Sequence, residues 1–131
     1  MEMKKKETLY KGKTIEELKA LETREFAQFV DSRARRTILR QFREIENFVS
    51  RANKKLSKGK TIKTHHRDLV VVPKMVGMKL QIYNGKTFVP TEVVIEMLGH
   101  KFGEFAPTRT RVKHGSAGVG STKGTKSKAK K

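Results

Sequence analysis

Residues 78–89 read MKLQIYNGKTFV, and this stretch decides the fold of the chain. Apolar residues in its first half alternate with polar ones and a tyrosine, at Met78, Leu80 and Ile82 against Lys79, Gln81 and Tyr83. That alternation is typical of a strand with one buried face. Asn84-Gly85 follows, the strongest short signal for a hairpin closed by a type I′ turn. Residues 86–89 then predict the returning strand of an antiparallel hairpin.

The sequence on either side of the hairpin predicts one more strand and a short helix. Leu69-Val70-Val71-Val72 is a β-branched run stopped by Pro73, which favours a strand. After the hairpin, Thr91 is expected to cap a short helix through Val94, Ile95 and Leu98, with Gly99 ending it. We therefore expect an α+β fold: a small antiparallel sheet with short helices.

The N-terminal part predicts helices. Thr14-Ile15-Glu16-Glu17 has the Thr-x-x-Glu form of a capping box, and a related helical stretch follows through Phe26, Phe29 and Val30. Asp31 and Ser32 then suit the start of a longer helix, with apolar residues at steps of three and four at 34, 38, 42, 45, 49, 52 and 56. Its opposite face is rich in arginine, at Arg33, Arg36, Arg40, Arg43 and Arg51.

Charge is the dominant feature of the composition. The 131 residues carry 31 Lys and Arg against 13 Asp and Glu, a net charge of +18, and only 35% are hydrophobic. So much like charge favours a polyanionic partner, and the modest apolar content predicts a small core. The chain has no cysteine, which excludes disulfides, thiol catalysis and Cys-ligated zinc. With neither a signal-peptide pattern near the N-terminus nor an apolar run long enough for a membrane span, we expect a soluble intracellular protein that binds nucleic acid and no membrane.

The last part of the chain has a different composition. Residues 109–131 contain eight basic residues, four glycines and no acid, so this segment cannot form its own core. We expect it to be disordered alone and to become ordered along a nucleic acid; the alternative is a solubilising or targeting extension. The predicted organisation is an N-terminal helical extension at 1–57, a core α+β module at 58–108 and a basic flexible tail at 109–131.

Two other patterns admit alternative interpretations. The arginine face favours a helix laid against phosphates, although arginines paired with Glu44 and Glu46 would give an ordinary solvated face. His65 and His66 point to opposite sides of an extended segment, so they cannot converge on one metal ion or proton. We find no catalytic constellation, no metal site and no cofactor motif.

Four motifs resemble small-subunit ribosomal protein family nineteen: VPKMVG at 72–77, IYNGK at 82–86, VP at 89–90 and GHKFGEFAPTR at 99–109. The match covers residues 62–115 in the family's order and spacing, and the helical N-terminal extension resembles the archaeal and eukaryotic branch. Lys74 departs from the family, which commonly has Glu there. The chain also lacks the extended ending common in eukaryotic members, which favours the archaeal form.

The resemblance implies a non-catalytic constituent of the small ribosomal subunit that acts in translation. It implies contact with rRNA of the subunit head (3′ major domain), with the neighbouring head protein of family thirteen, and a tail running towards the decoding A site and its tRNA. Together, the resemblance and the basic residues predict rRNA contacts at Arg33, Arg36, Arg40, Arg43, Lys63, Thr64, His65, Arg67, Lys86, His100, Lys101, Gly103, Thr108, Arg109, Arg111, Lys113 and His114. The alternatives are an architectural DNA-binding protein, or an RNA-processing enzyme that uses His65 or His100.

Overall fold

The computed structural model describes residues 7–120. In chain order the helices are α1 (Ile15–Ala20), α2 (Thr23–Phe26) and α3 (Ser32–Ser57), and the strands are β1 (Ile62–Thr64), β2 (Lys79–Tyr83) and β3 (Phe88–Glu92). Short 3₁₀ turns complete the chain, at η1 (Ala27–Phe29), η2 (Pro73–Met75), η3 (Ile95–Met97) and η4 (Phe102–Phe105). The predicted α+β class is confirmed. None of the helices in residues 7–120 is long and apolar enough to cross a membrane.

The sheet has the order β1-β2-β3. β2 and β3 pair antiparallel, with Tyr83 opposite Phe88, so the predicted hairpin is confirmed. β1 pairs parallel to β2, with Ile62 opposite Leu80, and makes the sheet a mixed one. A parallel partner needs a long connection, here residues 65–78, and no local pattern indicates which strand it will join.

The hairpin loop differs from the predicted turn type. A type I′ turn needs positive φ at both central residues, but here Gly85 has φ +98° and Asn84 does not have positive φ. The loop instead spans the four residues between Tyr83 and Phe88. The Asn84 carboxamide oxygen accepts hydrogen bonds from the N–H groups of Lys86 and Thr87, at 2.9 and 2.7 Å. The asparagine therefore stabilises the loop through its side chain.

The segments on either side of the hairpin differ from their predicted structures. Residues 69–72 are fully buried but form only an isolated bridge, between Val70 and Lys101. Their partners are residues 99–102, which the sequence does not mark as a strand. Thr91 lies within β3 and caps no helix, and the predicted helix contracts to η3. Gly99 does end that turn, with φ +81°, and its missing side chain leaves room for Val30 and Tyr10.

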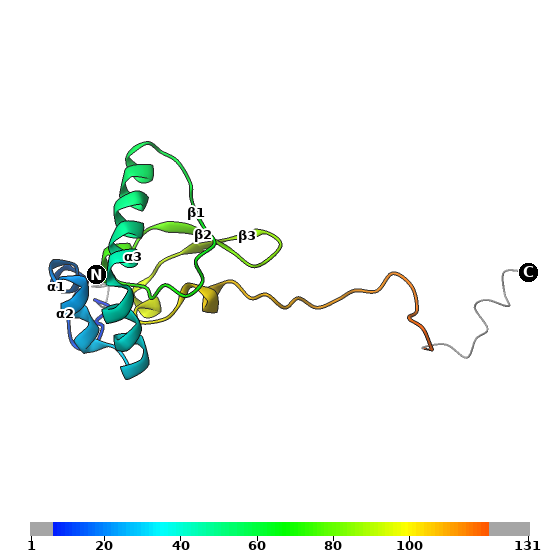
Figure 1. Cartoon of the computed structure of the whole chain (residues 1–131), viewed down its shortest axis with the longest axis horizontal. Helices are drawn as coiled ribbons and strands as arrows, with labels where there is room; N and C mark the ends of the chain where they lie inside the picture. The colour runs from blue at the N-terminus through cyan, green and yellow to red at the C-terminus, as the bar shows by residue number, and fades with distance from the viewer. Residues whose placement is uncertain (1–6, 121–131) are drawn as a thin grey trace, which may run out of the picture.

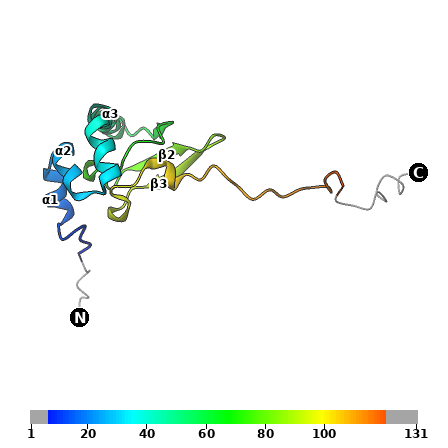
Figure 2. The same cartoon turned by 60° about the horizontal axis from the view of Figure 1, so that its bottom comes forward.

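The helical prediction for the N-terminal part is confirmed. Thr14 and Glu17 form the capping box at the start of α1. α3 begins after Asp31, and it bends at Gln41, where φ is −112° and ψ is 19°. Figure 2 shows the two halves of α3 running in different directions, with the helix on one side of the β2–β3 hairpin.

A single core joins the helices to the sheet. Phe26 of α2, Ile38 and Ile45 of α3, and Ile82 of β2 are all fully buried in one cluster, together with Phe102 of η4. This core crosses the predicted boundary at residue 57, and the division of the chain into 1–57, 58–108 and 109–131 stays a prediction. Beyond η4 the chain extends away from the domain in Figure 1, with no helix or β-strand from residue 107 to residue 120.

Candidate nucleic-acid interface

The N-terminal half of α3 gathers exposed arginines. Arg33, Arg36 and Arg40 line a shallow hollow of about 350 Å³, which lies next to the bend at Gln41. Arg43 is exposed one turn further on, beside the ring of Phe42. Within residues 7–120 no ion pair joins these arginines to Glu44 or Glu46, because the one pair found there is His100–Glu104. The guanidinium groups therefore remain available for an anionic ligand.

Arg35 has a different role from its neighbours in α3. Its Nε donates to the Ala27 carbonyl at 3.0 Å, and one terminal nitrogen donates to the Gln28 carbonyl at 3.3 Å. These carbonyls belong to the turn that precedes α3, so Arg35 fixes the turn against the helix. Arg35 is not one of the arginines that the sequence analysis assigned to the arginine face.

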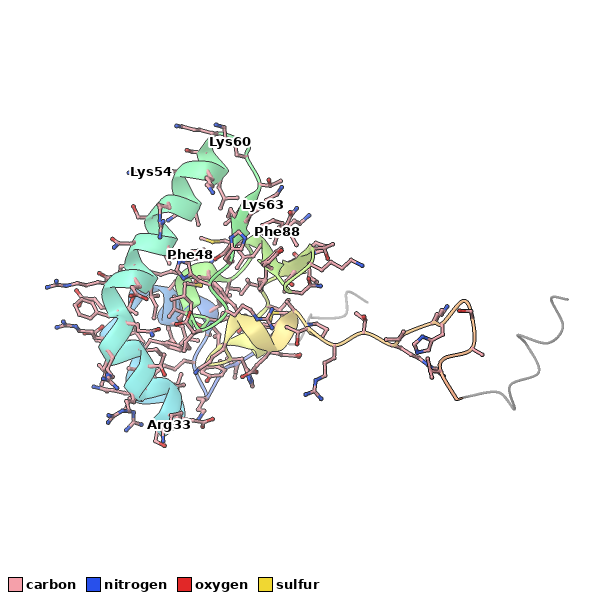
Figure 3. The ribbon with its side chains drawn as sticks, turned by 45° about the vertical axis from the view of Figure 1, so that its right-hand side comes forward. Arg33, Phe48, Lys54, Lys60, Lys63 and Phe88 are labelled. Atoms are coloured by element: carbon pink, nitrogen blue, oxygen red, sulfur yellow. The ribbon has the colours of Figure 1, made fainter. Side chains whose placement is uncertain are left out.

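The C-terminal half of α3 and β1 enclose a second basic hollow, which we call the α3–β1 cleft. It has a volume of about 210 Å³ and is lined by Phe48, Arg51, Ala52 and Lys55 from α3 and by residues 62–66 from β1 and the segment after it. Figure 3 shows Lys63 beside the C-terminal half of α3, which carries Lys54 and ends shortly before Lys60. Lys55 was not among the predicted contacts, whereas Arg51 was predicted only as part of the arginine face and His66 only as a residue that contacts RNA or caps the strand. The spacing of Arg51 and Lys55, four residues apart on one helix, is a signal that would have added Lys55.

Three rings gather beside this cleft, at His65, Tyr83 and Phe88, and we call them the ring cluster. The His65 ring lies 4.6 Å from the Tyr83 ring and 5.2 Å from the Phe88 ring, between centroids, and the last two are 5.0 Å apart. The Lys63 ammonium lies 5.3 Å from the centre of the Phe88 ring. His65 was a predicted contact, but the two aromatic residues were not, because their cross-strand pairing accounts for them within the hairpin.

Arg67 is used inside the fold. Its guanidinium donates to the Tyr83 carbonyl at 2.7 Å, the Gly103 carbonyl at 2.9 Å and the Ala106 carbonyl at 2.7 Å. Gly103 packs tightly on it, since a Cβ there would lie 3.1 Å from the Arg67 carbonyl oxygen. The arginine therefore ties the end of β2 to η4 and to the root of the tail.

Thr64 is also oriented inwards. Its side chain is 5% exposed, and its hydroxyl accepts a hydrogen bond from the His66 N–H at 3.1 Å. Thr64, Arg67 and Gly103 are predicted rRNA contacts, but in the structure their hydrogen bonds and packing stabilise the backbone of the domain. None of the three presents a free donor as the arginines of α3 do.

His100, Lys101 and Lys86 are all exposed. The Nδ1 atom of His100 lies 2.6 Å from a carboxylate oxygen of Glu104, and both side chains are more than half exposed. Lys86 is in the hairpin loop, next to the Asn84 side chain that holds its N–H. In the described part of the chain no group of three or more His, Cys, Asp or Glu residues is arranged to hold a metal ion.

The tail presents its cations to solvent. Thr108, Arg109, Arg111, Lys113 and His114 are exposed and follow Ala106, which is fully buried. The remaining lysines of the predicted tail lie outside the described residues, at 123–131.

A groove of another character lies near the start of α1. Its lining is apolar, from Ile15, Val76, Val93, Val94 and Ile95. The carboxylates beside it are Glu7, Glu16 and Glu96, and none of the described residues that line it is a lysine or arginine. In a chain of net charge +18, this acidic and apolar surface contrasts with the arginine hollow and the α3–β1 cleft.

Comparison with known proteins agrees with these observations. The family model for ribosomal protein S19 matches residues 32–114, from the first residue of α3 into the tail. The small ribosomal subunit protein uS19 of Methanococcoides burtonii is 41% identical over 124 residues, which cover 94% of this chain and 88% of the relative. This relative is archaeal, as the resemblance to the archaeal form predicts. The family is a structural one without enzymatic activity, so the expectation of a non-catalytic protein is met. The chain belongs to the ribosomal protein S19 family.

Proposed function

We propose that the protein is a structural constituent of the small ribosomal subunit, where it acts in translation by binding rRNA of the subunit head, in the 3′ major domain near the decoding A site. Family membership over most of the chain is the observation that carries this proposal. The site geometry supports it, because two basic hollows and an exposed basic tail offer cations to the phosphates of a large folded RNA.

Binding follows from charge neutralisation. Lysine and arginine side chains that contact phosphates release condensed counterions, so affinity depends strongly on salt. Duplex RNA is recognised through shape and backbone contacts, and a folded protein with basic surfaces on several sides suits that mode. The direct contacts in the proposal are the exposed residues Arg33, Arg36, Arg40, Arg43, Lys63, His65, Lys86, His100, Lys101, Thr108, Arg109, Arg111, Lys113 and His114. Thr64, Arg67 and Gly103 contribute by holding the surface in shape.

The proposal includes a protein neighbour and a course for the tail. The apolar groove beside Glu7, Glu16 and Glu96 repels phosphate and suits a basic protein, and we assign it to the neighbouring head protein of family thirteen. The exposed tail leaves the opposite end of the domain in Figure 1, which is compatible with an approach towards A-site tRNA. Assembly into the subunit gives the protein a cytoplasmic location.

Sedimentation of lysate tests the proposal. The tagged full-length protein should migrate with the small subunit, and crosslinks should map to rRNA of the head. Purified protein should bind a head-domain rRNA fragment in a salt-sensitive manner and retain it against competing duplex DNA. Migration as free protein, or equal affinity for random duplex DNA, would contradict the proposal and favour the architectural DNA-binding alternative.

A further inference from the structure

We propose that the ring cluster and the α3–β1 cleft together bind one unpaired nucleotide of RNA, with the base stacked on the rings and its phosphate in the cleft. The inference rests on the proposed rRNA-binding function and names a site within it. It is carried by four side chains that converge from β1, its C-terminal extension, β2 and β3: Lys63, His65, Tyr83 and Phe88.

The sheet has one face open to solvent. Leu80 and Ile82 of β2 point into the core, so Lys79, Gln81 and Tyr83 point to the other side, where they are exposed or half-buried. Phe88 lies opposite Tyr83 on β3, and its side chain is half-buried. In β1, Ile62 and Thr64 are buried and Lys63 is exposed, so Lys63 and the next residue of the same parity, His65, share this open face.

The rings on this face form a surface that fits a nucleobase. All three centroid distances lie between 4.6 and 5.2 Å, and the rings are tilted by 51° to 77° to one another. Aromatic side chains on an open sheet are a common platform for unpaired bases, because every base has a π face. Paired bases inside a duplex cannot reach such a platform, so the ligand is an extruded or single-stranded nucleotide.

The adjoining cleft suits the phosphate of the same nucleotide. Arg51 and Lys55 of α3 line it together with Lys63 and His66, and the described residues that line it include no carboxylate. Lys63 belongs to both parts, since it lines the cleft and lies 5.3 Å from the Phe88 ring centre. A base on the rings therefore brings its phosphate within reach of these cations. Figure 3 shows Lys63 and Phe88 close together, beside the C-terminal half of α3.

Hairpin stability accounts for only part of the cluster. The Tyr83–Phe88 pair stabilises β2 against β3, as cross-strand aromatic pairs do. That role needs neither a third ring from the end of β1 nor a lysine above Phe88. It also needs no basic cleft at the adjacent edge of the sheet, whereas nucleotide binding uses all three features.

The test compares three RNA probes with the full-length protein: a short duplex with one bulged 2-aminopurine, the same duplex with an abasic bulge, and the fully paired duplex. Wild type is expected to bind the purine bulge about tenfold more tightly than the abasic one, with quenched 2-aminopurine fluorescence on stacking. Phe88→Leu and His65→Ala should lose this preference and keep their affinity for the paired duplex. Phe29→Leu is the matched control, since Phe29 also lies beneath a lysine, Lys13, but far along the chain from the site.

Each outcome decides the matter. Equal binding of the purine and abasic bulges by wild type overturns the nucleotide site and leaves rRNA binding intact. A preference that survives Phe88→Leu and His65→Ala also overturns it, as does equal loss in Phe29→Leu. Failure of wild type to bind any of the three RNAs would remove the proposed function itself, and the inference with it. His65 is exposed, so His65→Ala keeps the test valid if Phe88→Leu proves unstable in urea denaturation.

Discussion

Replacing Arg67 with methionine should destabilise the domain without changing its net contact with phosphate. Methionine keeps an unbranched stem but removes the guanidinium, which donates to the carbonyls of Tyr83, Gly103 and Ala106. These oxygens lie at the end of β2, in η4 and at the root of the tail. The loss of one side chain therefore disconnects three parts of the domain.

The size of the effect follows from the three hydrogen bonds. A bond to a charged donor contributes roughly 1.5–3 kcal/mol when buried. Arg67 is half-buried, and water can replace part of what the carbonyls lose, so about 1 kcal/mol for each bond is a suitable value. The expected cost of Arg67→Met is about 2–3 kcal/mol, or roughly 10 °C in Tm for a domain of this size. Arg67→Lys should fall between, because one ammonium cannot reach three carbonyls in different directions.

Urea and thermal denaturation, followed by circular dichroism, measure this cost. Arg36→Met is the matched control: Arg36 is exposed at the arginine hollow, so its stability should change by less than about 0.5 kcal/mol. If Arg67→Met proved as stable as wild type while the salt dependence of rRNA binding fell by about one phosphate contact, the guanidinium would be an RNA contact and our account of it would be wrong.

Three further predictions concern separate features. Gly103→Ala should cost about 1–2 kcal/mol in urea denaturation, since the new Cβ would meet the Arg67 carbonyl oxygen at 3.1 Å; an unchanged midpoint would show that the contact relaxes freely. Burial, and secondarily the nearby Asp31 carboxylate, raise the pKa of Tyr10, so the phenol favours the folded state below about pH 10 and this stabilisation is lost as pH rises further. Tyr10→Phe should therefore lose less stability than wild type in alkaline denaturation, and parallel curves would count against that. Finally, Arg33, Arg36 and Arg40 can be changed together to glutamine. The slope of log affinity against log salt for rRNA should then fall in magnitude by about 2–3, and an unchanged slope would remove the arginine hollow from the interface.

Local patterns predicted the elements whose determinants are local. The capping box at Thr14, the start of α3 after Asp31 and the hairpin around Gly85 each depend on residues a few positions apart, and each is confirmed. The turn type was wrong because the loop has four residues, and Asn84 contributes its side chain in place of a left-handed backbone.

Features that depend on distant residues could not be read in this way. The β-branched run at 69–72 has the composition of a strand, yet its hydrogen-bond partners are residues 99–102, which connect η3 to η4. The parallel pairing of β1 depends equally on a remote partner. Among the predicted contacts, composition identifies Arg67 only as a cation, and its three carbonyl partners lie 16 to 39 residues away. Charge therefore indicated the interface in general but could not separate surface cations from those that hold the fold.

The bend in α3 at Gln41 has a geometric consequence for the proposed rRNA interface. In a straight helix the arginine hollow and the α3–β1 cleft would share one axis and follow a single phosphate backbone. Because the helix axis changes direction between them, the two basic hollows point in different directions. If both hollows bind rRNA as proposed, the angle of the bend sets the spacing and mutual orientation of the RNA segments that they contact.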